Sequence, residues 1–296
     1  KTVEGINRLC VNESRNQSSL NRLLNESPFS LKELNQARLK VMDSVPGTQV
    51  KPKGVLGLDD TLLTHYGQHF EEIAYLYDHV QKTFVWAHNL VTLHYSDDET
   101  DYPLGFELWK PADLERLEQG LLAAGIRLKE SKQALKRTAP DKWRQYLISL
   151  WRRKQNKPGV AELYDSKLRI AERLLQEWVN THPGLKLPVA FDNWYTQPAF
   201  CHFVDESLHL PYVGTLSAED QVILQTGLER LDHFAERLKQ EHLEAVRQGQ
   251  PPVFKLIGIG YKGQRERYYS YCETHHIHNF GKHRLVINHR QADLSD

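Results

Sequence analysis

The order of the expected strands and helices is the feature that most limits the folds open to this sequence. Apolar segments rich in β-branched and aromatic residues predict three neighbouring strands, at 55–58, 84–95 and 103–109, which favour an antiparallel meander. Helices and strands then alternate: a charged helical stretch at 111–158, an amphipathic helix through 161–178, a strand at 187–191, a helix at 198–207, a strand at 210–216 and a helix at 217–248. We therefore expect a mixed α+β chain.

Turn-forming residues divide the chain into three expected parts. A helical stretch at 20–45, capped by Ser30, precedes the linker PGTQVKPKG at 46–54. From Pro251 onward, strand-like segments are joined by glycine-containing turns. The expected parts are an incomplete helical segment at 1–50, a core at 51–250 and a β-rich insertion at 251–296. Because Lys1 stands in place of an initiating Met, we expect the chain to begin inside a longer protein.

The composition indicates a globular protein in water. Hydrophobic residues make up 40% of the chain and charged residues 26%, and no run of about 18 apolar residues occurs, which argues against disordered and membrane-spanning classes. Cys10, Cys201 and Cys272 are too scattered for a disulfide framework or a zinc site. We expect a cytoplasmic protein with no membrane partner.

A formal net charge of zero conceals strong segregation of charge. Residues 59–118 hold thirteen Asp and Glu against three Lys and Arg, whereas residues 127–169 hold thirteen Lys and Arg against four Asp and Glu. Acidic groups beside a basic surface suit a metal-dependent nucleic-acid enzyme, because carboxylates hold cations and basic side chains displace counterions from phosphates. Arg152, Arg153 and Lys154 are our DNA-binding candidates here. Two solvated helix faces of opposite charge are the alternative.

Two carboxylate sites follow predicted buried strands: Asp59 and Asp60 come after VLGL, and Asp192 comes after LPVAF. Strand ends open into clefts in α/β sheets. Aspartates held on neighbouring strands can share two divalent cations, which would stabilise both the attacking and the leaving oxygen of a phosphodiester displacement. The structural alternative is that Asp60 begins a turn with Thr61 and that Asp192 caps the following helix.

The amino-acid sequence around both sites resembles that of transposases of bacterial insertion sequences. The resembling segments are LDDTLLTHYG at 58–67, YDH at 77–79, HNLVTLHY at 88–95 and YPLGFELW at 102–109 for the first-Asp block and its next strands, FDNWY at 191–195 for the second-Asp block, and SSLNRLLNESPFSLKELNQARL at 18–39 for the preceding helical segment. In their joint order, these segments resemble transposases of the Asp-Asp-Glu (DDE) type.

This resemblance implies a ribonuclease-H-like core, a five-stranded mixed sheet with flanking helices and a β-rich insertion. It implies that Asp60 and Asp192 are catalytic and bind two Mg²⁺ or Mn²⁺ ions, with Asp59 in reserve for Asp60. In the implied reaction, water frees a 3′-hydroxyl at a transposon end, and that hydroxyl attacks target DNA. The implied partners are double-stranded DNA and a second copy of the chain, a homodimer on DNA in the cytoplasm at the nucleoid.

The sequence departs from the family at its third carboxylate, a Glu that belongs to a Tyr-x-x-Arg-x-x-x-Glu motif. No Tyr here has Arg three positions later, and Glu266, Glu273 and Asp293 lie in strand-like or terminal sequence. We therefore expect the chain to end before this motif, and residues 1–296 alone to fold without catalysing transposition. A DNA-binding remnant without catalysis and a stand-alone nuclease of the same fold are the alternative functions.

Other polar groups carry weaker interpretations. Lys262, Arg265 and Arg267 offer a second path for DNA. The spacing within Cys272, His275, His276, His278, His283 and His289 matches no usual four-ligand zinc pattern. Tyr268, Tyr269 and Tyr271 are expected to pack in a strand rather than to stack on DNA bases. We expect His65 and His88 to be structural.

Overall fold

The computed structural model describes residues 18, 19, 22, 26, 30–67, 69–261 and 264–294. The chain divides into two compact units, residues 1–49 and 50–296. In the first unit, helix α3 (Leu31–Asp43) begins at Ser30, whose hydroxyl accepts a hydrogen bond from Glu33 N at 3.1 Å. The Glu33 carboxylate accepts from Ser30 N at 3.0 Å, which completes a capping box. The predicted cap at Ser30 is confirmed.

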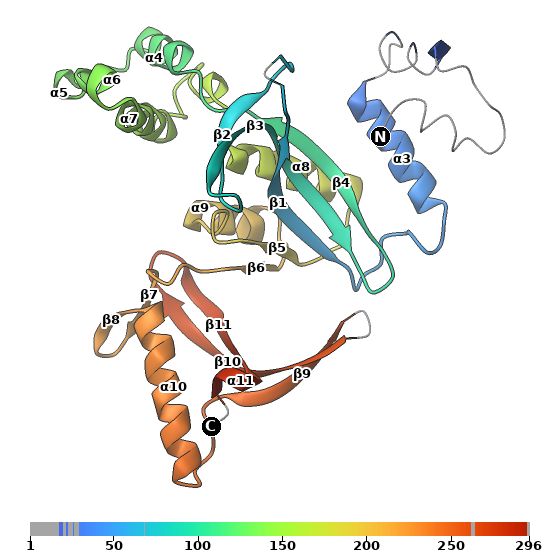
Figure 1. Ribbon diagram of the computed structural model, residues 1–296, viewed down its shortest axis with the longest axis vertical. Coiled ribbons are helices and arrows are strands. Elements are labelled where there is room, and N and C mark those ends of the chain that lie inside the picture. The colour runs from blue at the N-terminus through green and yellow to red at the C-terminus, as the bar shows by residue number, and fades with distance from the viewer. Residues whose placement is uncertain are drawn as a thin grey trace. The chain divides into compact units, whose positions relative to one another are not determined.

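The second unit is built on a mixed sheet of strands β1 (Val55–Thr64), β2 (Ala74–Asp78), β3 (Thr83–Ser96), β4 (Asp101–Trp109), β5 (Val189–Phe191) and β6 (Tyr212–Gly214) (Figure 1). The first four strands pair antiparallel, whereas β5 lies parallel to β1 and β6 parallel to β5. Ala87 of β3 pairs with Thr64 of β1 and with Ala74 of β2, so β1 and β2 lie on opposite edges of β3.

The order across this sheet is that of a ribonuclease-H-like fold. Both β2 and β4 pair with β3 on the edge away from β1, at different stretches of β3, so the six strands form a sheet five strands wide. The expected mixed sheet with flanking helices and a β-rich additional part is confirmed. Strand β2 was not predicted. It pairs with the part of β3 that precedes the β4 pairing.

Helices α8 (Lys167–Thr181) and α9 (Pro198–His202) cover one face of the sheet, which we call the covered face (Figure 1). A Cβ on Gly105 of β4 would lie only 3.0 Å from Leu174 of α8, so the helix packs closely on the strand. Phe200 of α9 packs edge-to-face against Phe191 of β5, with ring centroids 5.4 Å apart. Contacts on this face therefore hold α8 and α9 against the strands.

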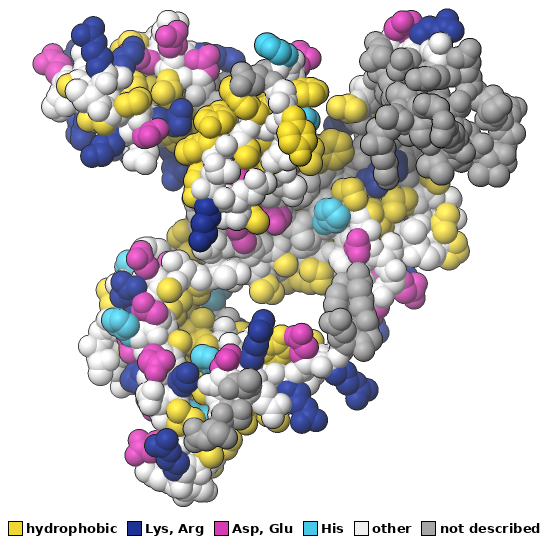
Figure 2. Space-filling model, in the orientation of Figure 1, with side chains coloured by type: hydrophobic (Ala, Val, Ile, Leu, Met, Phe, Trp, Pro, Cys, Tyr) yellow, Lys and Arg dark blue, Asp and Glu magenta, His cyan; other side chains and the backbone are white. Residues whose placement is uncertain are grey.

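The opposite face, which we call the open face, retains exposed apolar side chains in the described part of the chain. Because side chains alternate along a strand, residues on this face follow from the register. Its exposed members are Val55, Leu63, Tyr75, Tyr77, Phe84, Phe106, Leu108 and Val213. Figure 2 shows hydrophobic side chains gathered over the β2 end of the sheet. A contiguous apolar surface of this kind marks a place where another element or molecule packs.

Between β4 and α8 the chain forms a helical module of α4 (Leu114–Ala123), α5 (Glu130–Gln133), α6 (Leu135–Thr138), α7 (Pro140–Arg153) and the 3₁₀ turn Ala161–Leu163. The module has a hydrophobic core of its own, formed by Ala112, Leu117, Leu121, Ile126, Trp143, Leu147, Leu150, Trp151 and Val160. Trp151 Nε1 donates to the carbonyl of Val160 at 2.9 Å inside this core. The charged stretch expected to be helical therefore folds into a separate packed layer.

The β-rich part contains β7 (Gln221–Leu224), β8 (Gly227–Arg230), β9 (Lys255–Tyr261), β10 (Gln264–Ile277) and β11 (Gly281–Arg290), with helices α10 (Leu231–Arg247) and α11 (Gln291–Leu294). The expected helix at 217–248 is wrong in its first half, because residues 221–230 form a hairpin that joins this sheet through β10. Gly227, at a φ of +126°, permits the tight turn of that hairpin, a conformation closed to other residues.

Imidazole rings form part of the core of the β-rich part. His242 of α10 is 2% exposed, and its Nδ1 accepts a hydrogen bond from Phe254 N at 3.1 Å. Burial lowers the pKa of His242, and the nearby His289 lowers it further. The neutral ring is therefore the form that the folded protein holds, because protonation of Nδ1 would remove the acceptor and bury a charge.

Acidification is expected to destabilise the β-rich part through His242. The folded-state pKa lies below the unfolded value of about 6.5, so this contribution to stability is present above pH 6.5 and is lost as the pH falls through the folded-state pKa. Thermal melting between pH 7.5 and 5 should show a smaller loss of Tm in His242→Gln than in the wild type. The exposed His233→Gln on the same helix is the control, and an identical pH profile for both variants would contradict this account.

Candidate active site

Asp59 and Asp60 lie inside β1 rather than after it, because the strand continues to Thr64. The alternative in which Asp60 begins a turn is therefore wrong. Strand β1 pairs with β3 along its whole length but with β5 only from Leu56 to Leu58. Both aspartates thus lie just beyond the point where β1 loses β5 as a neighbour, which leaves room beside them.

The two aspartates point to opposite faces of the sheet, as successive residues of a strand do. Asp60 shares the covered face with Leu56 and Leu58, which are buried. Asp59 lies on the open face and is exposed. Adjacent residues in the sequence therefore have very different surroundings, which sequence motifs alone do not reveal.

Asp192 follows β5 directly, as predicted. Its Oδ1 accepts hydrogen bonds from Trp194 N at 3.0 Å and from Tyr195 N at 3.3 Å, so the side chain closes the turn that leads toward α9. The alternative in which Asp192 caps the following helix is wrong, because α9 begins at Pro198 with Gln197 as its N-cap residue, and Asp192 closes a turn instead. One carboxylate oxygen serves this turn, and the remaining lone pairs of the carboxylate can accept further ligands.

The register of the parallel pair brings Asp59 and Asp192 together. Leu58 of β1 is the partner of Phe191 of β5, and each aspartate is the next residue along its strand. Although Asp59 is exposed, partial desolvation of its carboxylate by neighbouring atoms raises its pKa, the hydrogen bond from Asp60 N to Asp59 Oδ1 (2.7 Å) lowers it, and the negative charges of Asp192 and Asp60 raise it again. Two carboxylates that repel each other in this way favour a cation between them.

Asp60 is surrounded by donors on the covered face. Its Oδ2 accepts from Lys167 Nζ at 2.7 Å and from Asn89 Nδ2 at 2.8 Å, and its Oδ1 accepts from the Tyr195 hydroxyl at 3.3 Å. The sequence interpretation gave no role of its own to Lys167, within the basic stretch 127–169, or to Asn89, within the HNLVTLHY segment. Tyr195 is the last residue of the FDNWY segment, so the resemblance of that segment to the family could have marked it as a candidate.

A complete set of acidic or imidazole ligands is not present among the described residues: no group of three or more His, Cys, Asp or Glu could hold a metal ion there. Glu266 and Glu273 lie on β10, and Asp293 lies on α11. The site in the described chain therefore offers the exposed carboxylates of Asp59 and Asp192 and one neutralised carboxylate, that of Asp60.

The basic candidates Arg152, Arg153 and Lys154 lie at the carboxyl end of α7 and just after it, and all three are exposed. Around them the module carries further exposed cations at Arg127, Lys129, Lys132, Arg137 and Lys142. Within the described residues, none of these eight side chains forms an ion pair. A surface of unpaired cations attracts polyanions strongly.

Of the second set of basic candidates, Arg265 and Arg267 lie on β10, whereas Lys262 falls outside the described residues. Their partners across the hairpin are Gly260 and Gly258 of β9. A Cβ on Gly258 would meet nothing within 4 Å, so this side of the ribbon is open beside the arginines. Arg265, Arg267 and Arg290 also line a shared hollow.

The histidine group on β10 and β11 shows hydrogen bonds rather than ligand geometry. Tyr271 Oη lies 2.7 Å from His275 Nε2, and His283 Nε2 lies 2.8 Å from the Phe280 carbonyl. Of the tyrosines, Tyr269 and Tyr271 contact buried rings of the β-rich core, and Tyr268 bonds to Glu266. His65 and His88 bond to each other at 2.8 Å.

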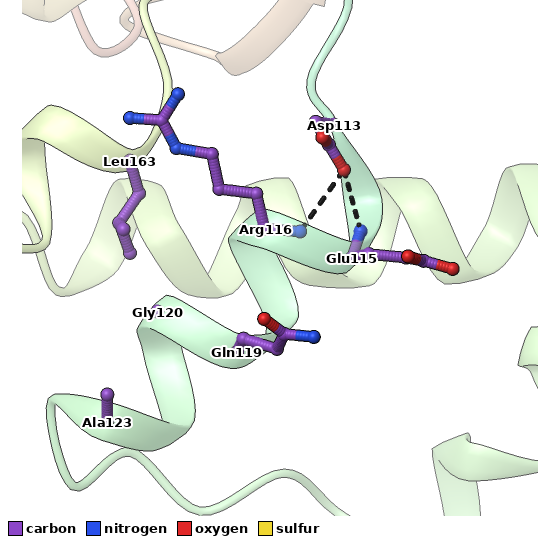
Figure 3. Close-up of a pocket in the computed structure, with 7 residues that line it drawn as sticks. All are labelled: Asp113, Glu115, Arg116, Gln119, Gly120, Ala123 and Leu163. Atoms are coloured by element: carbon purple, nitrogen blue, oxygen red, sulfur yellow. Dashed lines mark hydrogen bonds between the residues drawn. The ribbon is translucent and has the colours of Figure 1, made fainter.

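Figure 3 shows a separate hollow along α4, lined by Asp113, Glu115, Arg116, Gln119, Gly120, Ala123 and Leu163. Asp113 Oδ1 there accepts from the backbone N of Glu115 at 3.0 Å and of Arg116 at 3.1 Å, which is ordinary helix capping. The hollow contains none of the residues that sequence analysis singled out. The side chain of Asp113 already caps the helix.

A ribonuclease-H-like sheet with aspartates beside the junction of its neighbouring parallel strands β1 and β5 is typical of nucleic-acid phosphoryl-transfer proteins. The chain belongs to the family described as DDE superfamily endonuclease, whose model matches residues 1–227. The sequence resemblance to DDE-type transposases is therefore confirmed at the level of the family.

Two further findings accompany this assignment. No curated protein matches the chain significantly. None of the helices in the described part of the chain combines the length and apolar character needed to cross a lipid bilayer.

Proposed function

We propose that this chain carries the catalytic centre of an insertion-sequence transposase, which cleaves DNA strands and joins a freed 3′-hydroxyl to target DNA. The observation that carries the proposal is that Asp59 and Asp192 each come one residue after the paired residues Leu58 of β1 and Phe191 of β5. Membership in the DDE superfamily endonuclease family supports nuclease chemistry at this point of the fold. We also propose a homodimer on DNA, in the cytoplasm at the nucleoid.

Divalent Mg²⁺ or Mn²⁺ fits the donors available here, since both ions prefer carboxylate oxygens. Such ions, two per site, supply charge stabilisation to the attacking and leaving oxygens of a phosphodiester. The residues that would hold them are Asp192 and one aspartate of β1. A further oxygen ligand would have to come from an element that packs on the open face, where Asp59 lies.

Sequence motifs favoured Asp60 as the β1 ligand, with Asp59 in reserve. The contacts support the reverse assignment. Asp60 already accepts three hydrogen bonds from side chains, one of them from the ammonium of Lys167, whereas Asp59 lies exposed beside Asp192. A cation approaching Asp60 would have to displace Lys167, so we propose Asp59 and Asp192 as the metal-binding pair, with Asp60 behind them.

A second candidate function, DNA binding without cleavage, is favoured by one observation: the described residues hold no group of three side chains able to bind a metal ion. Under this proposal, the exposed cations of the helical module hold the DNA backbone.

Nicking of supercoiled plasmid by the purified chain, with Mn²⁺ or with EDTA, separates the two functions. Mn²⁺-dependent conversion to open circles would support the catalytic proposal. DNA retention in a gel shift without nicking at any Mn²⁺ concentration would support the binding function and contradict catalysis by this chain. Transfer of a labelled 3′-hydroxyl end into the plasmid would distinguish a transposase from a stand-alone nuclease.

A further inference from the structure

A hydrogen-bonded network on the covered face lies directly behind the proposed metal-binding pair. It is centred on Asp60, whose side chain is 19% exposed and is paired with Lys167, itself 15% exposed. We call Asp60, Lys167, Asn89 and Tyr195 the Asp60 network. Ion pairs this far out of solvent need good geometry and additional hydrogen bonds, and Asp60 has them in Asn89 and Tyr195.

Lys167 is held from several sides. It is the first residue of α8, behind the cap Ser166, and its ammonium lies 4.8 Å from the ring centre of Trp109 and 5.3 Å from that of Trp194. Aromatic faces attract a cation at this distance. The ammonium is therefore confined near Asp60 Oδ2 and supplies positive charge to the carboxylate at a defined position.

Tyr195 connects the two strands that carry Asp59 and Asp192. The side chain is fully buried, its hydroxyl donates to Asp60 Oδ1, and its backbone N donates to Asp192 Oδ1 at 3.3 Å. Asp60 is bonded covalently to Asp59. One buried residue thus links the side chain of Asp60 on β1 with the carboxylate of Asp192.

Asn89 completes the network from β3. It is 3% exposed, its amide donates to Asp60 Oδ2, and its own Oδ1 has no hydrogen-bond partner in the described structure. A buried amide with an unsatisfied oxygen is unfavourable for the fold. The amide nitrogen of Asn89 is thus committed to Asp60, while its oxygen gains no bond in return.

We propose that Asp60, Lys167 and Tyr195 are positioning residues that set the separation of the Asp59 and Asp192 carboxylates and thereby the affinity for divalent cations. This inference rests on the proposed function. Asp60 stays neutralised by Lys167 and binds no metal ion itself. Residues that orient metal ligands from behind in this way typically change metal affinity by about 10- to 100-fold when altered.

The test compares Tyr195→Phe with Tyr212→Phe in the full 296-residue chain. Tyr212 lies on β6 of the same sheet, and its hydroxyl bonds to Cys201 instead of to an aspartate. Each variant loses one buried phenol hydrogen bond, so both should lower Tm by a similar amount. Mn²⁺ affinity, measured from the electron paramagnetic resonance signal of free Mn²⁺, should fall about tenfold in Tyr195→Phe alone.

A double-mutant cycle tests whether Asp60 and Tyr195 act as one unit. Asp60→Asn should weaken Mn²⁺ binding by about as much as Tyr195→Phe, and the double variant should be no weaker than Asp60→Asn, because both changes break the same bond. Additive losses, or unchanged affinity in Tyr195→Phe, would overturn the inference. Complete loss of binding in Asp60→Asn would overturn it too, since Asp60 would then be a ligand.

Failure of the proposed function gives a different pattern. If Asp192→Asn removes Mn²⁺ binding while Tyr195→Phe does not weaken it, the metal site stands and only the positioning role falls. If the wild type binds no Mn²⁺, the proposed metal site falls and the positioning role falls with it.

Discussion

Asp59→Asn and Asp192→Asn are each expected to reduce Mn²⁺-dependent plasmid nicking by about 10³-fold or more. Each substitution keeps the size of the side chain but removes an anionic ligand, and metal ions contribute several kcal/mol to the stabilisation of a phosphoryl-transfer transition state, where about 1.4 kcal/mol corresponds to tenfold in rate. Initial rates of open-circle formation, together with Mn²⁺ binding, give the measurement. Loss of both in the same variant would tie the chemistry to this pair.

Asp205→Asn is the matched control, because it makes the same chemical change at an exposed carboxylate between β5 and β6. It should nick and bind Mn²⁺ as the wild type does. If Asp59→Asn nicks DNA at the wild-type rate, Asp60 rather than Asp59 is the metal ligand on β1. If Asp192→Asn nicks DNA at the wild-type rate, Asp192 is not a metal ligand.

Reversal of Arg152, Arg153 and Lys154 to Glu is expected to weaken DNA binding by roughly tenfold or more. The triple substitution replaces three exposed positive charges with three negative ones at the end of α7. For every phosphate that the variant no longer neutralises, the slope of log affinity against log salt should also become shallower by about 0.9. Fluorescence anisotropy of a labelled duplex over a series of salt concentrations measures both quantities.

Substitution of the same three residues by Gln should cause a smaller loss of DNA affinity, because it removes the positive charges without adding negative ones. Its affinity should lie between those of the wild type and the Glu variant. An unchanged salt slope in both variants would show that DNA follows another path, for which the open ribbon with Arg265 and Arg267 on β10 is the next candidate.

Local sequence patterns were sufficient where an element's own residues decide its structure. Ser30 and Glu33 start α3 through a capping box that involves only neighbours in the chain. The strands at β1, β3, β4, β5 and β6 were each expected from their apolar and β-branched residues. The hairpin at 221–230 was missed because its pairing with β10 is a contact between distant segments, which a local pattern does not contain.

The sequence by itself determined which residues carry chemistry: the aspartates after VLGL and LPVAF, and the segregation of acidic from basic residues. Only the tertiary structure decided how Asp59 and Asp60 differ. The two residues are adjacent in the sequence, but successive side chains of a strand point to opposite faces of the sheet, and α8 covers the face that carries Asp60. The positions of Lys167 and Tyr195, 107 and 135 residues from Asp60, followed from packing between distant segments, because hydrogen bonds of that kind exist only after the sheet and its helices have assembled.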